Sequence, residues 1–150
     1  MLINKLENKR PFIVSGPCSA ESEQQVLKTA SAIKPVVDVF RAGIWKPRTK
    51  PNSFEGVGEK GLNWLKKVQY EFEIKVCTEV ATPRHVEACL KSEIDMLWIG
   101  ARTTVNPFYV DEIAQALKGN DIPILIKNQR EMGLDFHFLD LETIKEVSTN

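Results

Sequence analysis

Reactive and cationic side chains recur in this sequence at or just after the ends of short apolar runs. A thiol follows the first run, a carboxylate ends the third, and lysine or arginine side chains end or follow the second, fourth and fifth. Arginine binds carboxylates and phosphates through paired hydrogen bonds, and lysine binds them as a point charge. The set therefore predicts a site for a strongly anionic small molecule. Its members are Cys18, Arg41, Lys46, Arg48, Glu79, Arg102 and Lys127.

The cysteines and histidines lead to different predictions. The thiolate of Cys18 could ligate a divalent metal if further ligands came from elsewhere in the protein. A single cysteine is more often a small buried hydrophobic residue, and this interpretation is kept for Cys77 and Cys89. His85 and His137 do not lie at strand ends and are not predicted to be site residues.

The apolar runs are predicted to be buried strands, because the segments between them have the periodicity of amphipathic helices. The order βαβαβαβαβ predicts a parallel sheet covered by helices. Ser19 and Thr82 are expected N-caps, Pro83 the first residue of its helix, and Gly119 the end of the last one. The expected strands are residues 12–14, 36–44, 74–80, 96–99 and 122–126, and the expected helices are residues 20–34, 59–72, a segment starting at 83, and 107–118.

Two architectures share this α/β order. A (β/α)₈ barrel usually needs about 250 residues, and this chain has 150, so length alone favours a doubly wound open sheet. The cations at the ends of several strands favour the barrel, whose binding face is built from the carboxyl ends of its strands. We therefore expect a (β/α)₈ (TIM) barrel that is truncated after strand five and continues as a short tail.

The composition argues against some kinds of binding partner and some cellular compartments. Twenty basic residues balance twenty acidic ones, which argues against bulk attraction to nucleic acid or to an anionic membrane. The three cysteines show no CxxC spacing, so a reducing, cytoplasmic location is expected rather than a disulfide framework. Residues 1–10 are polar and contain no apolar core of a signal sequence, so we expect an N-terminal extension there. No apolar run approaches the roughly 20 residues of a membrane span.

Four short motifs follow the predicted strands in order. They are Gly16-Pro17-Cys18-Ser19, Arg41 with Lys46-Pro47-Arg48-Thr49, Ile99-Gly100-Ala101-Arg102-Thr103-Thr104, and Lys127-Asn128. Together they resemble 3-deoxy-7-phosphoheptulonate (DAHP) synthase, in the subgroup that shares a scaffold with 3-deoxy-octulosonate-8-phosphate (KDO8P) synthase. The resemblance covers residues 11–128.

The resemblance implies a (β/α)₈ barrel that condenses phosphoenolpyruvate with erythrose 4-phosphate and releases phosphate. This is the first step of the shikimate pathway toward chorismate and the aromatic amino acids. It implies a divalent metal such as Mn²⁺, which would polarise the sugar aldehyde. Cys18 matches a metal ligand of the family, and Lys46 and Lys127 match its catalytic residues, with Lys127 expected in proton transfer. The residues that match a phosphoenolpyruvate site are Arg41, Lys46, Arg102 and Lys127, and Glu79 matches a carboxylate beside that site. The residues that match those holding erythrose 4-phosphate are Lys46, Arg48 and Thr49.

The same resemblance favours one sugar phosphate over another. KDO8P synthases bind arabinose 5-phosphate and carry an Ala-Asn-Arg type of sequence in the loop where this chain has Lys46-Pro47-Arg48-Thr49. We therefore expect erythrose 4-phosphate to be the co-substrate.

Residues 129–150 do not resemble the family's continuation after strand five, although residues 140–147 have the pattern of a short helix. In the family, the other metal ligands and a further phosphate-binding arginine come from the three later strands. The chain is therefore expected to be inactive by itself, with strands one and five as unpaired edges that promote association. An intact version is expected to be a homo-oligomer.

Two other functions remain open on the sequence. One is a non-catalytic module that binds phosphoenolpyruvate or phosphate. The other is an assembly fragment that acts only with a second chain supplying the rest of the barrel. Turnover with both substrates and added Mn²⁺ distinguishes the enzyme from both alternatives.

Overall fold

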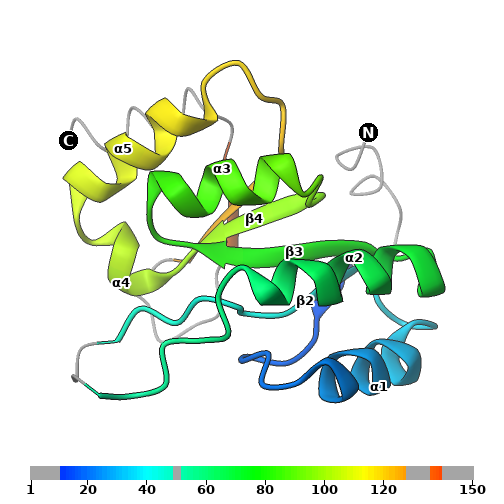
Figure 1. Ribbon diagram of the computed structural model, residues 1–150. Helices are drawn as coiled ribbons and strands as arrows, with labels where there is room; N and C mark the ends of the chain where they lie inside the picture. The colour runs from blue at the N-terminus through cyan, green and yellow to red at the C-terminus, as the bar shows by residue number, and fades with distance from the viewer. Residues whose placement is uncertain (1–10, 49–51, 128–135, 140–150) are drawn as a thin grey trace.

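The computed structural model describes residues 11–48, 52–127 and 136–139, the last segment by its backbone alone. These residues form one sheet with helices packed against it (Figure 1). The strands are β1 (Val14–Ser15), β2 (Val39–Arg41), β3 (Lys75–Val80), β4 (Met96–Ile99), β5 (Ile124–Lys127) and β6 (Phe136–Leu139). The helices are α1 (Glu23–Ile33), α2 (Lys60–Phe72), α3 (Pro83–Lys91), α4 (Ala101–Thr104) and α5 (Pro107–Leu117).

The strands follow one another across the sheet in the order of the chain. β1 to β5 are all parallel, and β6 lies antiparallel to β5. A doubly wound sheet reverses its strand order at a switch point, and no reversal occurs among the described strands. The prediction of a half-barrel is therefore confirmed, and the open doubly wound sheet favoured by length alone is wrong.

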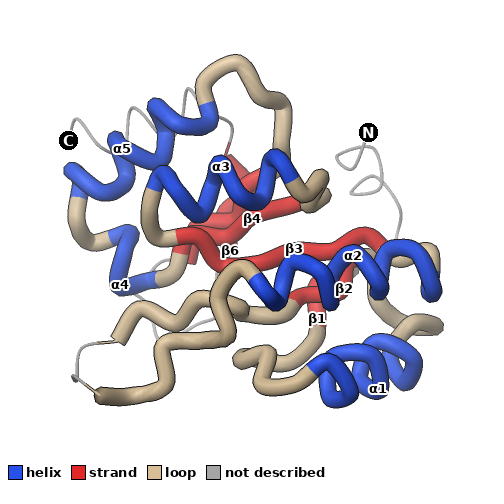
Figure 2. The backbone as a smooth tube through the Cα atoms, in the orientation of Figure 1, coloured by secondary structure: helices blue, strands red, loops and turns tan. Residues whose placement is uncertain are grey.

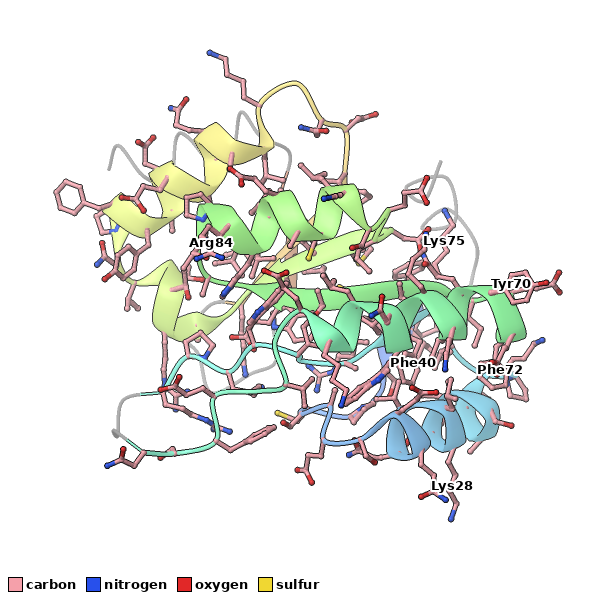
Figure 3. All side chains as sticks on the ribbon, in the orientation of Figure 1. Lys28, Phe40, Tyr70, Phe72, Lys75 and Arg84 are labelled. Atoms are coloured by element: carbon pink, nitrogen blue, oxygen red, sulfur yellow. The ribbon has the colours of Figure 1, made fainter. Side chains whose placement is uncertain are left out.

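The two faces of the sheet are buried by different means. On the outer face, strand residues such as Phe40, Val76 and Ile99 share one apolar core with the inward sides of α1, α2, α3 and α5. Figure 2 shows these helices together on one side of the strands. Figure 3 shows Phe40 between the sheet and the helices, whereas Tyr70 points away from α2.

The opposite, inner face has a smaller apolar cluster of its own. Because side chains alternate along a strand, every second residue belongs to this face. None of the described helices contributes to the cluster, which corresponds to the inward layer of a barrel. Its buried members are Val39, Cys77, Met96, Trp98 and Leu125.

The helix starts follow from local capping. Thr82 caps α3 by accepting a hydrogen bond from the backbone N–H of His85, and Pro83 is the first helical residue, as predicted. The expected cap Ser19 is wrong for α1. Ser22 caps that helix instead, because its Oγ accepts from the backbone N–H of Gln25, and the helix starts three residues later than predicted.

Three elements depart further from the sequence predictions. β2 is shorter than residues 36–44, since hydrogen-bonded pairing covers only Val39–Arg41. The short helix α4 had no signal in the periodicity. β6 was not predicted either, and its pairing with β5 overturns the expectation that strand five is an unpaired edge. The helix expected over residues 140–147 lies outside the described residues.

Of the described helices, none combines the length and the apolar character that crossing a bilayer requires.

Candidate functional site

The carboxyl ends of the parallel strands bring the predicted site residues to one edge of the sheet. Arg41 and Lys127 are the last residues of β2 and β5, and Glu79 is the last but one of β3. Arg102 lies in α4, directly after β4. Cys18 and Lys46 lie in the loops that follow β1 and β2.

Lys46, in the loop after β2, contacts both the loop after β1 and strand β3. Its Nζ donates a hydrogen bond to the backbone carbonyl of Cys18 at 2.9 Å and lies 3.5 Å from the Cys18 Sγ. The same Nζ lies 3.4 Å from Oε2 of Glu79. The two charged side chains are only 11% and 13% exposed, so water screens this pair less than it would a surface pair.

Glycines make the close approach of these groups sterically feasible. A Cβ atom at Gly100 would lie 2.2 Å from Oε1 of Glu79, and a Cβ at Gly43 would lie 2.5 Å from the carbonyl oxygen of Cys18. Any larger residue at Gly100 would push the carboxylate out of its place. The close approach of Glu79 therefore explains why the Ile99-Gly100-Ala101-Arg102 motif has a glycine at position 100.

Arg41 is held by an aromatic ring. Its Cζ lies 5.5 Å from the centroid of the Trp98 ring, a cation–π arrangement between β2 and β4. Among the described residues, no carboxylate is paired with the Arg41 guanidinium. Sequence reasoning identified Arg41 but not Trp98, whose place on the inner face could have been inferred from strand alternation.

Two arginines fix the loop that follows β2. Arg48 Nε donates to the carbonyl of Phe54 at 2.8 Å, and Arg102 Nη1 donates to the carbonyl of Pro47 at 2.9 Å. The backbone N–H of Lys46 donates to the carbonyl of Glu55 at 2.7 Å and closes the base of the loop. Thr49, predicted to bind substrate, lies outside the described residues.

A stacked pair of rings lies beside this loop. The rings of Trp45 and His85 are 4.1 Å apart between centroids and inclined by 7°. Nδ1 of His85 accepts a hydrogen bond from the backbone N–H of Ala81 at 3.2 Å, so in the neutral ring the proton is on Nε2. Burial lowers the pKa of His85, and the nearby Arg84 charge lowers it further. No sequence pattern placed His85 next to this loop, because the contact joins two different βα units.

Lys127 belongs to the same inner face by strand alternation. Leu125, two residues earlier, is buried in the inner cluster, and side chains two apart point to the same side. The Lys127 side chain is exposed. It is therefore a cation at the rim of the site.

The ligand set of the expected metal is not found among the described residues. Within them, no group of three histidine, cysteine, aspartate or glutamate side chains could hold a metal ion. Cys18 is exposed and has the Lys46 ammonium beside its sulfur. By contrast, burial raises the pKa of Cys77 well above its ordinary value and that of Cys89 to about 12, in keeping with the core positions predicted for them.

The family comparison covers nearly the whole chain. Residues 3–149 match the model of the DAHP synthetase I family. The phospho-2-dehydro-3-deoxyheptonate aldolase of Thermotoga maritima is 36% identical over 103 residues, which are 68% of this chain and 30% of that protein. The 2-dehydro-3-deoxyphosphooctonate aldolase of Wolinella succinogenes is 31% identical over 145 residues, which are 89% of this chain and 52% of that protein.

Solved structures that resemble this chain include the same class of enzyme. A crystal structure of the Thermotoga maritima phospho-2-dehydro-3-deoxyheptonate aldolase (DAHP synthase) superposes with a TM-score of 0.64 at 30% identity, over 78% of this chain and 32% of that one. A truncated form of the 3-deoxy-D-arabino-heptulosonate 7-phosphate synthase from the same organism gives 0.61 at 26% identity, over 91% and 45%. The chain thus spans between about a third and a half of the length of these proteins.

Proposed function

The chain belongs to the DAHP synthetase I family, and from this premise we propose that it carries the phosphoenolpyruvate-binding half of a DAHP synthase. The reaction is the condensation of phosphoenolpyruvate with erythrose 4-phosphate, with release of phosphate, at the entry to the shikimate pathway. The observation that supports it best is the meeting of Cys18, Lys46 and Glu79 at the carboxyl ends of the strands. The cations Arg41, Arg102 and Lys127 lie at the same edge.

Each cation has a role that follows from its charge and place. Phosphoenolpyruvate carries a carboxylate and a phosphate, which Arg41, Lys46, Arg102 and Lys127 would bind and neutralise. Lys46 and Arg48, on one loop, would hold the phosphate of the sugar together with Thr49. Glu79 would keep Lys46 oriented, and Lys127 would hold or transfer a proton at the rim of the site.

The described residues would supply only part of the metal site of an intact enzyme. Cys18 would be one ligand to the family's divalent metal, such as Mn²⁺, in an intact barrel. The described residues do not complete the ligand set, so we propose that these 150 residues alone bind phosphoenolpyruvate without turning it over. The intact protein is proposed to be a cytoplasmic homo-oligomer.

KDO8P synthase is the second candidate. Relatives named 2-dehydro-3-deoxyphosphooctonate aldolase, such as that of Variovorax paradoxus, are 32% identical over 77% of this chain. The loop sequence Lys46-Pro47-Arg48-Thr49 favours erythrose 4-phosphate over arabinose 5-phosphate, because KDO8P synthases carry an Ala-Asn-Arg type of sequence at this place.

The test combines binding and turnover on the purified chain. Isothermal titration calorimetry with phosphoenolpyruvate is expected to show binding that is lost in Lys46→Met. Phosphate release with Mn²⁺ and either sugar phosphate is expected to stay at background. Release that requires erythrose 4-phosphate and disappears in Cys18→Ala would contradict the predicted inactivity and establish the enzyme; release with arabinose 5-phosphate would establish the second candidate.

A further inference from the structure

Arg41 differs from the other cations of the site in how its charged group is held. Lys46, Arg48 and Arg102 each donate a hydrogen bond to a backbone carbonyl. In the part of the chain that the structure describes, the guanidinium of Arg41 has the ring of Trp98 as its contact, at 5.5 Å. Its charge is thus held by a group that does not neutralise it.

The register of the sheet explains this contact. Arg41 pairs with Cys77 on β3, and Cys77 pairs with Met96 on β4. Trp98 lies two residues beyond Met96 and therefore on the same inner face, nearer the carboxyl end. The Arg41 side chain must reach across β3 to lie over the indole, and that direction leads toward Glu79 and the rim.

Trp98 is a fixed support for the arginine. Its side chain is 6% exposed and packs with Val39, Cys77, Met96 and Leu125 in the inner cluster. A long arginine side chain loses rotamer entropy when a ligand orders it. An arginine already held over a buried ring has lost part of that freedom before the ligand arrives.

The contact also leaves the N–H groups of the guanidinium available. The ring attracts the charge of the cation, whereas a hydrogen-bond acceptor would take up one or more of its five N–H donors. No described carboxylate pairs with them. A carboxylate or phosphate can therefore form two parallel hydrogen bonds with these donors.

We propose that Trp98 is a positioning residue, which holds the Arg41 guanidinium over its ring so that the N–H groups of the arginine meet an anionic group of the ligand. The inference rests on the proposed function, because it takes phosphoenolpyruvate as that ligand. Trp98 acts through Arg41 and need not touch the ligand itself.

A double-mutant cycle on phosphoenolpyruvate affinity tests this role. Trp98→Leu is expected to weaken binding by about two- to thirtyfold, the range that a cation–π contact gives. Trp98→Phe keeps a ring face and is expected to stay within about threefold of the wild type. In an Arg41→Leu background, Trp98→Leu is expected to have almost no further effect.

Trp64 provides a matched control on the other face of the sheet. It is 5% exposed, and Lys60 Nζ lies 5.7 Å from its ring centroid, but it lies in α2, outside the site. Trp64→Leu should therefore destabilise the fold as Trp98→Leu does and leave the affinity unchanged. An equal loss of affinity in Trp64→Leu, or an equal effect of Trp98→Leu with and without Arg41, would overturn the inference.

A ligand-free measurement separates this inference from the proposed function. In NMR spectra of the wild type, the ring current of Trp98 is expected to shift the Arg41 side-chain signals upfield, less so in Trp98→Phe. If Trp98→Leu does not fold, the Arg41 signals are compared between the wild type and Trp98→Phe alone. Unshifted Arg41 signals would refute the positioning even where phosphoenolpyruvate binds. Shifted signals without any binding would refute the proposed function, and with it the role in ligand capture.

Discussion

Among the cations of the site, Lys46 is the one that is paired with a carboxylate within the described residues. Its ammonium lies against the Cys18 carbonyl and the Glu79 carboxylate, so its charge is largely balanced. Arg41 and Lys127 have no such carboxylate partner among the described residues. An anion should therefore be attracted first by these two, and Lys46 should then exchange part of its contact with Glu79 for the ligand.

Gly100→Ala tests the fit between Glu79 and the turn after β4. The new methyl group would meet Oε1 of Glu79 at 2.2 Å, and the flexible end of the side chain would have to move. We expect a stability loss of about 1–2 kcal/mol and roughly tenfold weaker phosphoenolpyruvate binding, the loss of one charge-assisted contact. Urea unfolding and calorimetry measure the two effects.

Gly119→Ala is the control for that variant. Gly119 has a φ of +83°, and no atom lies within 4 Å of the place that an added Cβ would take. Alanine there is strained without steric contact, and the residue lies between α5 and the start of β5, away from the carboxyl ends of the strands. It should lower stability and leave the affinity unchanged. Unaltered affinity in Gly100→Ala as well would show that the place of Glu79 does not matter for binding.

The lowered pKa of His85 predicts that the stability of the fold depends on pH. Its folded pKa lies below its ordinary value of about 6.5, so the unfolded chain binds the proton more readily. The contribution of neutral His85 is complete above about pH 6.5 and is lost as the pH falls toward the folded pKa. Protonation at Nδ1 would also break the hydrogen bond from Ala81.

Denaturant unfolding between about pH 7.5 and pH 5 measures this effect. The wild type should lose stability below about pH 6.5, and His85→Phe, which keeps a ring against Trp45 but cannot titrate, should lose less. The lowered pKa of Glu93, caused by Lys66, acts only at lower pH. Identical slopes in the two proteins would exclude His85 as the source.

At the scale of elements, the N-cap of α3 holds His85, which stacks on Trp45 in the loop that follows β2. Thr82→Ala removes the hydroxyl that accepts from the backbone N–H of His85, and this should cost about 1 kcal/mol of stability. Thr82→Ser keeps the hydroxyl and should cost little. Urea unfolding gives both free energies, and near-ultraviolet circular dichroism reports whether the environment of Trp45 changes when the cap is removed. Equal losses of stability in Thr82→Ala and Thr82→Ser would argue against a role of the hydroxyl as the cap.

The five parallel strands, the four longer helices and the cations at the strand ends were predictable from sequence, whereas the contacts between elements were not. Arg41, Glu79 and Lys127 could be placed because they end apolar runs of strand length, and Thr82-Pro83 because capping is a local interaction. The Trp98–Arg41 and Trp45–His85 contacts depend on register and rotamers across different βα units, which periodicity does not encode. β6 was missed because four residues in a region of unfamiliar sequence carry too little pattern to identify a strand.

At the scale of the whole molecule, β6 covers the hydrogen-bonding groups of the outer edge of β5. A variant that ends at Lys127 would expose this edge, and open edges promote association. We expect light scattering to show larger species for that variant than for the full chain at equal concentration. A variant that stays as small as the full chain would mean that β6 does not protect the edge.

The position of β6 also bears on how a barrel could be completed. In a parallel barrel the sixth strand must bind the same row of backbone groups on β5 that β6 occupies in the antiparallel direction. Only one strand can bind there at a time. Any second segment, from this chain or another, would therefore have to displace β6 first, and the rate of assembly would be governed by how often β6 detaches.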